Sequence, residues 1–132
     1  PWWQARAAVA RLTDLFAGWG VWPTWMLGSA IVGVVIGLFP KMSKNCVDQG
    51  ELPKSAITLF IILSFLGNFV GYMISAILDF FIFTEPLDKV VTQQLLVAFT
   101  NTVVIAILGT LLLYLVVRRN KSKQNLTKDT DA

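Results

Sequence analysis

The sequence predicts an all-α protein, a polytopic transmembrane helical bundle, from three observations. First, 55% of its 132 residues are hydrophobic and only 14% are charged, whereas a soluble domain has about a quarter of its residues charged. Second, the mean hydropathy is +0.66, and the apolar residues gather into three long runs. Third, lysine and arginine gather between and after these runs, which is typical of loops that flank membrane spans.

The opening segment, residues 1–17, favours a helix but makes a poor central span. Its ARAAVARLTDLFA stretch contains good helix formers, and Arg11 and Asp14 are spaced to pair. Its two arginines are unfavourable in a bilayer centre. Two interpretations therefore stay open: the outer end of a preceding helix, or an interfacial helix. Residues 18–23, GWGVWP, predict the turn that follows.

Three apolar runs are predicted to be membrane spans, and they lie at residues 24–39, 55–83 and 90–117. The first is near the lower limit of about 17 residues for a hydrocarbon core of about 30 Å, and Trp22 and Trp25 extend it into the interface. The second is longer than a perpendicular crossing requires, so we expect it to tilt or project. Glu85-Pro86 predicts a break before the third span, because proline lacks an N–H and restricts the preceding residue.

Positive charge predicts the orientation. The loop at residues 40–54 carries Lys41, Lys44 and Lys54, and four further cations follow the third span: Arg118, Arg119, Lys121 and Lys123. Such clusters favour the cytoplasmic side, and the two regions agree because two spans separate them. The C-terminus is therefore expected in the cytoplasm, and the turns at residues 18–23 and 84–89 outside. We expect residues 1–119 to form a single transmembrane domain and residues 120–132 a disordered cytoplasmic tail.

A polar stripe interrupts the second span. Asn68, Tyr72, Ser75 and Asp79 are spaced four, three and four residues apart, so they share one helix face. Polar groups inside a bilayer are expensive and usually face a partner helix or a water-filled cavity. The stripe therefore predicts a helix that lines something, although Asp79 lies near the outer end, where a hydrated helix end is an alternative.

Small residues recur every four positions on two spans, where they allow helices to approach closely. Two interpretations are open for them: packing within this protein, or docking of a separate membrane subunit. These residues are Ser29, Gly33 and Gly37 in the first span and Gly67, Gly71 and Ser75 in the second.

Aromatic and polar residues mix at the predicted outer ends of the spans. Flat rings stack on a heteroaromatic ligand, and amides or carboxylates orient it by hydrogen bonds. An interfacial belt is the alternative for Trp22 and Trp25, and interhelical hydrogen bonding is the alternative for Gln94 and Asn101. The candidate ligand contacts are Trp19, Trp22, Asn68, Tyr72, Asp79, Gln93, Gln94 and Asn101.

The composition excludes several classes of site. Without histidine and with one cysteine, Cys46, the chain has no histidine-based metal site or general base and no internal disulfide. Cys46 is expected to be a neutral loop thiol. No phosphate-binding loop or catalytic constellation occurs, so the protein is not expected to be an enzyme, and no cofactor or metal is expected on this chain. The charge pattern indicates a lipid bilayer as partner, not nucleic acid.

Two stretches carry a family resemblance: WGVWPTWMLGSAIVGVVIGLFPK, and GNFVGYMISAILDFFIFTEPLDKVVTQQLLVAFTNTVVIAILGTLLL. They resemble the substrate-binding (S) component of energy-coupling-factor (ECF) vitamin transporters, closest to the riboflavin-type branch. The resemblance covers about residues 18–117. It implies six transmembrane helices in the full-length protein, of which this chain holds three and part of a fourth, and it implies that the first two helices are missing here.

The resemblance also implies a mechanism and partners. An S component in the plasma membrane of a bacterium captures a vitamin or precursor outside. It then associates with a membrane T subunit and two cytoplasmic ATPases, which hold the ATP-Mg. Riboflavin is the substrate that the branch suggests, with cobalamin or a thiamine-precursor pyrimidine as other candidates. Two other functions stay open: a non-transporting membrane assembly subunit, and a self-contained secondary transporter.

Overall fold

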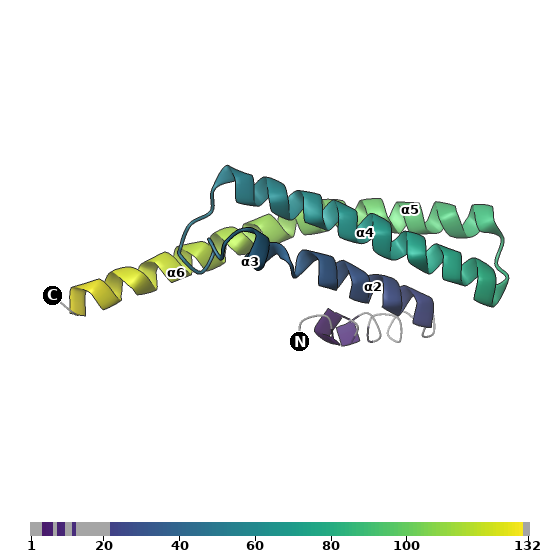
Figure 1. Cartoon of the computed structure of the whole chain (residues 1–132), viewed down its shortest axis with the longest axis horizontal. Helices are drawn as coiled ribbons and strands as arrows, with labels where there is room; N and C mark the ends of the chain where they lie inside the picture. The colour runs from purple at the N-terminus through teal and green to yellow at the C-terminus, as the bar shows by residue number, and fades with distance from the viewer. Residues whose placement is uncertain (1–3, 7, 10–11, 13–21, 131–132) are drawn as a thin grey trace.

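The computed structural model describes residues 4–6, 8–9, 12 and 22–130, with side chains in the last helix described to residue 126 (Figure 1). Its helices are α2 Pro23–Ile36, α3 Phe39–Met42, α4 Lys54–Phe83, α5 Leu87–Val104, the π-helix η1 Ile105–Gly109 and α6 Thr110–Thr130. The described residues contain no strand. Within the described residues, three segments are long and apolar enough to cross a membrane: Pro23–Met42, Lys54–Phe83 and Leu87–Leu126. The predicted all-α transmembrane bundle is confirmed.

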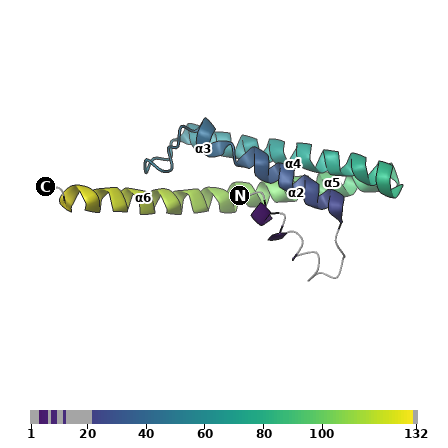
Figure 2. The same ribbon diagram turned by 60° about the horizontal axis from the view of Figure 1, so that its bottom comes forward.

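Helix α4 is the centre of the bundle. α2 packs along one side of it and α5 runs along another (Figure 1). Its 30 residues correspond to about 45 Å at 1.5 Å per residue, which exceeds the hydrocarbon thickness, as the sequence predicts. Figure 2 shows α6 continuing far beyond the end of this three-helix packing.

The first span is interrupted near its end. α2 begins at Pro23, a position where proline is favoured because an N–H there has no helical partner. It ends at Ile36, and a turn at Gly37 and Leu38 leads into the short α3. Pro40 accounts for the interruption, because it cannot donate a hydrogen bond to the carbonyl four residues earlier. The span predicted at residues 24–39 lies within the segment Pro23–Met42, but its helix is interrupted at Gly37 and Leu38.

Glycines bring α2 and α4 into close contact. A Cβ placed on Gly71 would lie 2.6 Å from the carbonyl oxygen of Gly28, and one on Gly67 would lie 3.3 Å from that of Val32. Gly67, Gly71 and Ser75 thus face α2 within this chain. Of the predicted small residues on α2, Ser29 and Gly33 are buried and Gly37 is half-buried at the helix end. Gly28, the direct partner of Gly71, was not among them.

The third span is longer than predicted, because α5, η1 and α6 form one continuous helical segment. The side chain of Phe60 lies over Gly109 of the π-helix, where a Cβ would come within 2.5 Å of the Phe60 Cζ atom. The tail, expected to be disordered after Arg119, is helical to Thr130.

The start of that tail has partners in the lysine-containing loop. Asn120 Nδ2 donates to the carbonyl of Val47 at 2.9 Å, and Gln124 Nε2 donates to that of Asp48 at 3.2 Å. These long-range contacts, which the local composition does not reveal, attach the polar segment to the loop. They also place the two lysine- and arginine-rich regions at the same end of the bundle.

Cys46 lies in this loop, as expected, but it is buried. It is 7% exposed and packs with Phe39, Ala56, Phe60 and Leu63. The only cysteine of the chain is therefore a small apolar side chain in the core at the loop end of the bundle.

Candidate functional site

The polar stripe of α4 is buried along its whole length. The exposed fractions are 0% for Asn68, 4% for Tyr72, 0% for Ser75 and 3% for Asp79. The side chains therefore face the helices that pack on α4 rather than lipid. The expectation that this helix face lies against a partner or a cavity is met by α2 and α5 of the same chain.

Asp79 joins three helices. Thr24 Oγ1 of α2 donates to its Oδ1, while Trp25 Nε1 of α2 and Gln94 Nε2 of α5 donate to its Oδ2 at 3.0 and 3.2 Å. A carboxylate in a membrane costs about 2.5–3.5 kcal/mol on insertion scales, and these three donors offset that cost. The alternative of a hydrated helix end is therefore wrong for Asp79.

Tyr72 forms a second polar junction about two turns away along α4. Asn101 Nδ2 of α5 donates to the Tyr72 hydroxyl at 2.9 Å, and Ser29 Oγ of α2 lies 3.5 Å from the same oxygen. The Tyr72 ring also meets Trp25 edge to face, with 6.4 Å between ring centroids. Asn101 thus has the interhelical role that the sequence left open as an alternative to ligand contact.

Two buried amides in this interface each have one oxygen that meets no donor in the described part of the chain. Gln94 Nε2 donates to Ser75 Oγ and Asp79, and Asn68 Nδ2 donates to the backbone carbonyl of Ser64, one turn earlier. Among the described residues, the Oε1 of Gln94 and the Oδ1 of Asn68 have no hydrogen-bond partner, although both side chains are 0% exposed. Gln94 thus bonds across the interface and Asn68 bonds within α4, and neither side chain lines the pocket described next.

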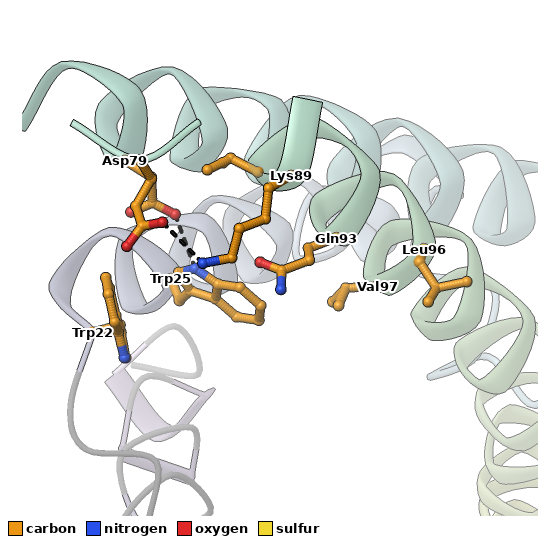
Figure 3. Close-up of a pocket in the computed structure, with 9 residues that line it drawn as sticks. Trp22, Trp25, Asp79, Lys89, Gln93, Leu96 and Val97 are labelled. Atoms are coloured by element: carbon orange, nitrogen blue, oxygen red, sulfur yellow. Dashed lines mark hydrogen bonds and ion pairs between the residues drawn. The ribbon is translucent and has the colours of Figure 1, made fainter. Parts of the chain in front are cut away.

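A pocket of about 430 Å³ opens beside this interface, at the end of the bundle opposite the lysine-containing loop. Figure 3 shows Trp22 and Trp25 projecting from the start of α2, and Gln93, Leu96 and Val97 projecting from α5. The pocket lining combines apolar and polar side chains: two indoles, three aliphatic side chains, one amide and three charged groups. The lining residues are Trp22, Trp25, Asp79, Glu85, Lys89, Val90, Gln93, Leu96 and Val97.

The charged rim of the pocket is partly self-neutralised. Lys89 Nζ lies 2.9 Å from Oε2 of Glu85, four residues earlier in the turn before α5, and the two side chains are 54% and 30% exposed. Such an exposed pair contributes little to stability, so either member remains available to a ligand. Among the described residues no three carboxylate or thiol side chains gather into a metal site.

The predicted ligand contacts divide into two groups. Trp22, Asp79 and Gln93 line the pocket, whereas Asn68, Tyr72, Gln94 and Asn101 lie in the helix interface behind it. Trp19 lies outside the described residues. The lining residues that were not among the predicted contacts are Trp25, Glu85, Lys89, Val90, Leu96 and Val97.

A signal for part of that second set was present in the sequence. Lys89, Gln93, Leu96 and Val97 recur at spacings of four, three and one, which places them on one face of α5. Trp22 and Trp25 are likewise three residues apart. Selection by polarity alone favoured Gln94 over Val97, although Gln94 points into the interface.

Comparison with known proteins gives relatives over most of the chain. The family described as ECF-type riboflavin transporter, S component, matches residues 7–118. The chain is 56% identical over 117 residues to a UPF0397 protein of Vibrio atlanticus, 51% identical over 117 residues to one of Vibrio vulnificus, and 30% identical over 118 residues to one of Streptococcus sanguinis. Each match covers 89% of this chain and 64% of the relative, so the chain spans about 64% of the length of these relatives. No solved structure matches the chain.

Proposed function

The chain belongs to the family of ECF-type riboflavin transporter S components, and from this premise we propose that it captures a vitamin or vitamin precursor outside the cell for uptake. The observation that carries the proposal is the pocket between the start of α2 and α5. Two indole rings there offer stacking surfaces, and Gln93, Glu85 and Lys89 offer hydrogen bonds and charge. Ligand sites of about 300–1,000 Å³ typically combine such apolar walls with a few polar groups.

The pocket faces outward in this proposal. The loop with Lys41 and Lys44 and the α6 segment with Arg118 and Arg119 lie together at the opposite end, joined by the Asn120 and Gln124 hydrogen bonds. Positive charge near span ends favours the cytoplasmic side. We therefore place the C-terminus in the cytoplasm of a bacterium and the Trp22 end at the outer surface.

Riboflavin is the first candidate substrate, because it is named in the description of the family. Its flat heteroaromatic ring system suits stacking on Trp22 or Trp25, and its ring amide and carbonyl groups suit Gln93. Cobalamin and a thiamine-precursor pyrimidine are the other candidates.

Energy for uptake would come from partners. The sequence carries no phosphate-binding loop, so we propose a membrane T subunit and two ATPases that bind ATP-Mg. The predicted small-residue rows do not identify the docking face, because Gly67 and Gly71 are already covered by α2.

The deciding experiment is uptake of riboflavin, cobalamin and the thiamine-precursor pyrimidine by cells that express the intact transporter. The matched control carries ATPases inactivated in their nucleotide sites. We expect accumulation of one vitamin that disappears in the control. Ion-gradient-driven uptake that survives ATPase inactivation would indicate a secondary transporter instead. Absence of uptake with copurification of an unrelated membrane complex would indicate an assembly subunit.

A further inference from the structure

We propose that Asp79 is a positioning residue that fixes the Trp25 indole as a pre-organised wall of the pocket. Asp79 lies among the pocket-lining residues, yet it is only 3% exposed. The effect of Asp79 on ligand affinity rests on the proposed function. The geometry that carries the assignment is independent of any ligand.

Both oxygens of Asp79 are already occupied. Thr24 donates to Oδ1, and Trp25 and Gln94 share Oδ2. An indole N–H can only donate, and an ionised carboxylate can only accept, at about four lone-pair positions. Three of these positions are filled within the protein, so Asp79 acts on a ligand through its neighbours.

The Trp25 ring is held at two points. Its Nε1 donates to Asp79, and the ring meets Tyr72 edge to face at an interplanar angle of 72°. The Tyr72 hydroxyl is in turn held by Asn101. Figure 3 shows Trp25 between Trp22 on one side and Gln93 on the other, within the pocket wall.

The shared oxygen also relates the two walls to each other. Oδ2 of Asp79 accepts from Trp25 on α2 and from Gln94 on α5, and the remaining pocket side chains project from these same two helices or the turn before α5. Fixing the walls before binding reduces the ordering cost that a ligand must overcome. Loss of Asp79 is therefore expected to weaken binding without removing a direct contact.

The first test needs no ligand. The intact protein is labelled with ¹⁵N-tryptophan in detergent micelles, and the Trp25 indole N–H resonance is assigned by its disappearance in Trp25→Phe. In Asp79→Leu, which removes every acceptor, this resonance should move upfield while the other indole resonances stay.

Asp79→Asn, which keeps a neutral acceptor, should give a smaller shift, and it serves as the test if the leucine variant fails to fold. Thr24→Val, which removes only the donor to Oδ1, is the matched control and should shift it least. An unmoved Trp25 resonance in both Asp79 variants overturns the proposal.

The second test is a double-mutant cycle with riboflavin as probe, read by fluorescence quenching. Asp79→Asn and Trp25→Phe should each weaken affinity about tenfold, the size expected for loss of one charge-assisted hydrogen bond. The double variant should lose less affinity than the product of the two single losses, because both changes remove the hydrogen bond between Trp25 and Asp79. Losses that multiply would mean that Asp79 acts independently of Trp25 and would overturn the positioning role. If the wild-type protein binds no riboflavin, that substrate fails, and the indole resonance still decides the role of Asp79.

Discussion

Gly28 and Gly71 face each other where α2 crosses α4, so closely that each would place a Cβ within about 3 Å of the other's carbonyl oxygen, at 3.0 and 2.6 Å. The atoms in the way are backbone, which cannot rotate aside. Gly71→Ala should therefore force the helices apart and destabilise the protein by about 1–3 kcal/mol, the usual range for overpacking. Thermal unfolding in detergent measures this.

Val70→Ala is the matched control for that prediction. Val70 is the preceding residue on α4 and is 47% exposed on the outer side, so its truncation should change the unfolding temperature far less. Equal stability of the two variants would contradict the close approach.

Gly109 should tolerate a larger side chain as poorly as Gly71 does. Here, however, the obstacle is a side chain, which a second substitution can remove. The missing Cβ of Gly109 leaves room for the Phe60 ring, so Gly109→Ala should cost about 1–3 kcal/mol. In a Phe60→Leu background the same change should cost much less, because the obstructing ring is gone. A double-mutant cycle of unfolding free energies measures the coupling. Additive losses would mean that the two residues are independent.

Gln93 and Gln94 are neighbours in sequence with opposite expected roles. Gln93 is exposed in the pocket, so Gln93→Leu should weaken riboflavin binding and leave thermal stability nearly unchanged. Gln94 is fully buried and hydrogen-bonded to Ser75 and Asp79, so Gln94→Leu should lower stability by about 1–3 kcal/mol. Titration and thermal unfolding of both variants separate the roles. The assignment fails if the two variants behave alike.

The labelling rate of the Cys46 thiol should report on the contact between the loop at residues 40–54 and α6. This thiol is buried, so modification by a maleimide requires local opening. Asn120→Ala removes the hydrogen bond to Val47, worth about 1 kcal/mol, and should raise the labelling rate roughly fivefold. Ser122→Ala, an exposed neighbour, should leave it unchanged. Equal rates in both variants would show that the bond does not hold the loop.

The sequence was sufficient for the long helices and for the polar face of α4. The apolar run predicted at residues 55–83, with the break predicted at Glu85-Pro86, matches α4 to within one residue of its observed start at Lys54. The stripe from Asn68 to Asp79 followed from the 3.6-residue period alone. Both depend on local order along the chain, which a single sequence contains.

Partners across the bundle could not be predicted in the same way. Polarity selected Asn68, Gln94 and Asn101 as ligand contacts, but the decision between ligand and neighbouring helix depends on which side chains lie opposite. Gln94 meets Asp79 because of the rotation of α5 against α4, which no local pattern encodes. The helical tail is a similar case, since Asn120 and Gln124 find acceptors more than seventy residues away.

The π-helix has a further consequence for the direction in which α6 points its side chains. Ala98 and Val117 are both buried although they are 19 residues apart, which at about 100° per residue would leave them about 100° out of phase on an ideal α-helix. A π turn accommodates one extra residue and so removes roughly this difference. The π-helix at residues 105–109 therefore sets the rotation of α6, which contacts the loop, relative to α5, which lines the pocket. Deleting a single residue there should rotate Asn120 and Gln124 away from the loop while leaving the walls of the pocket in place.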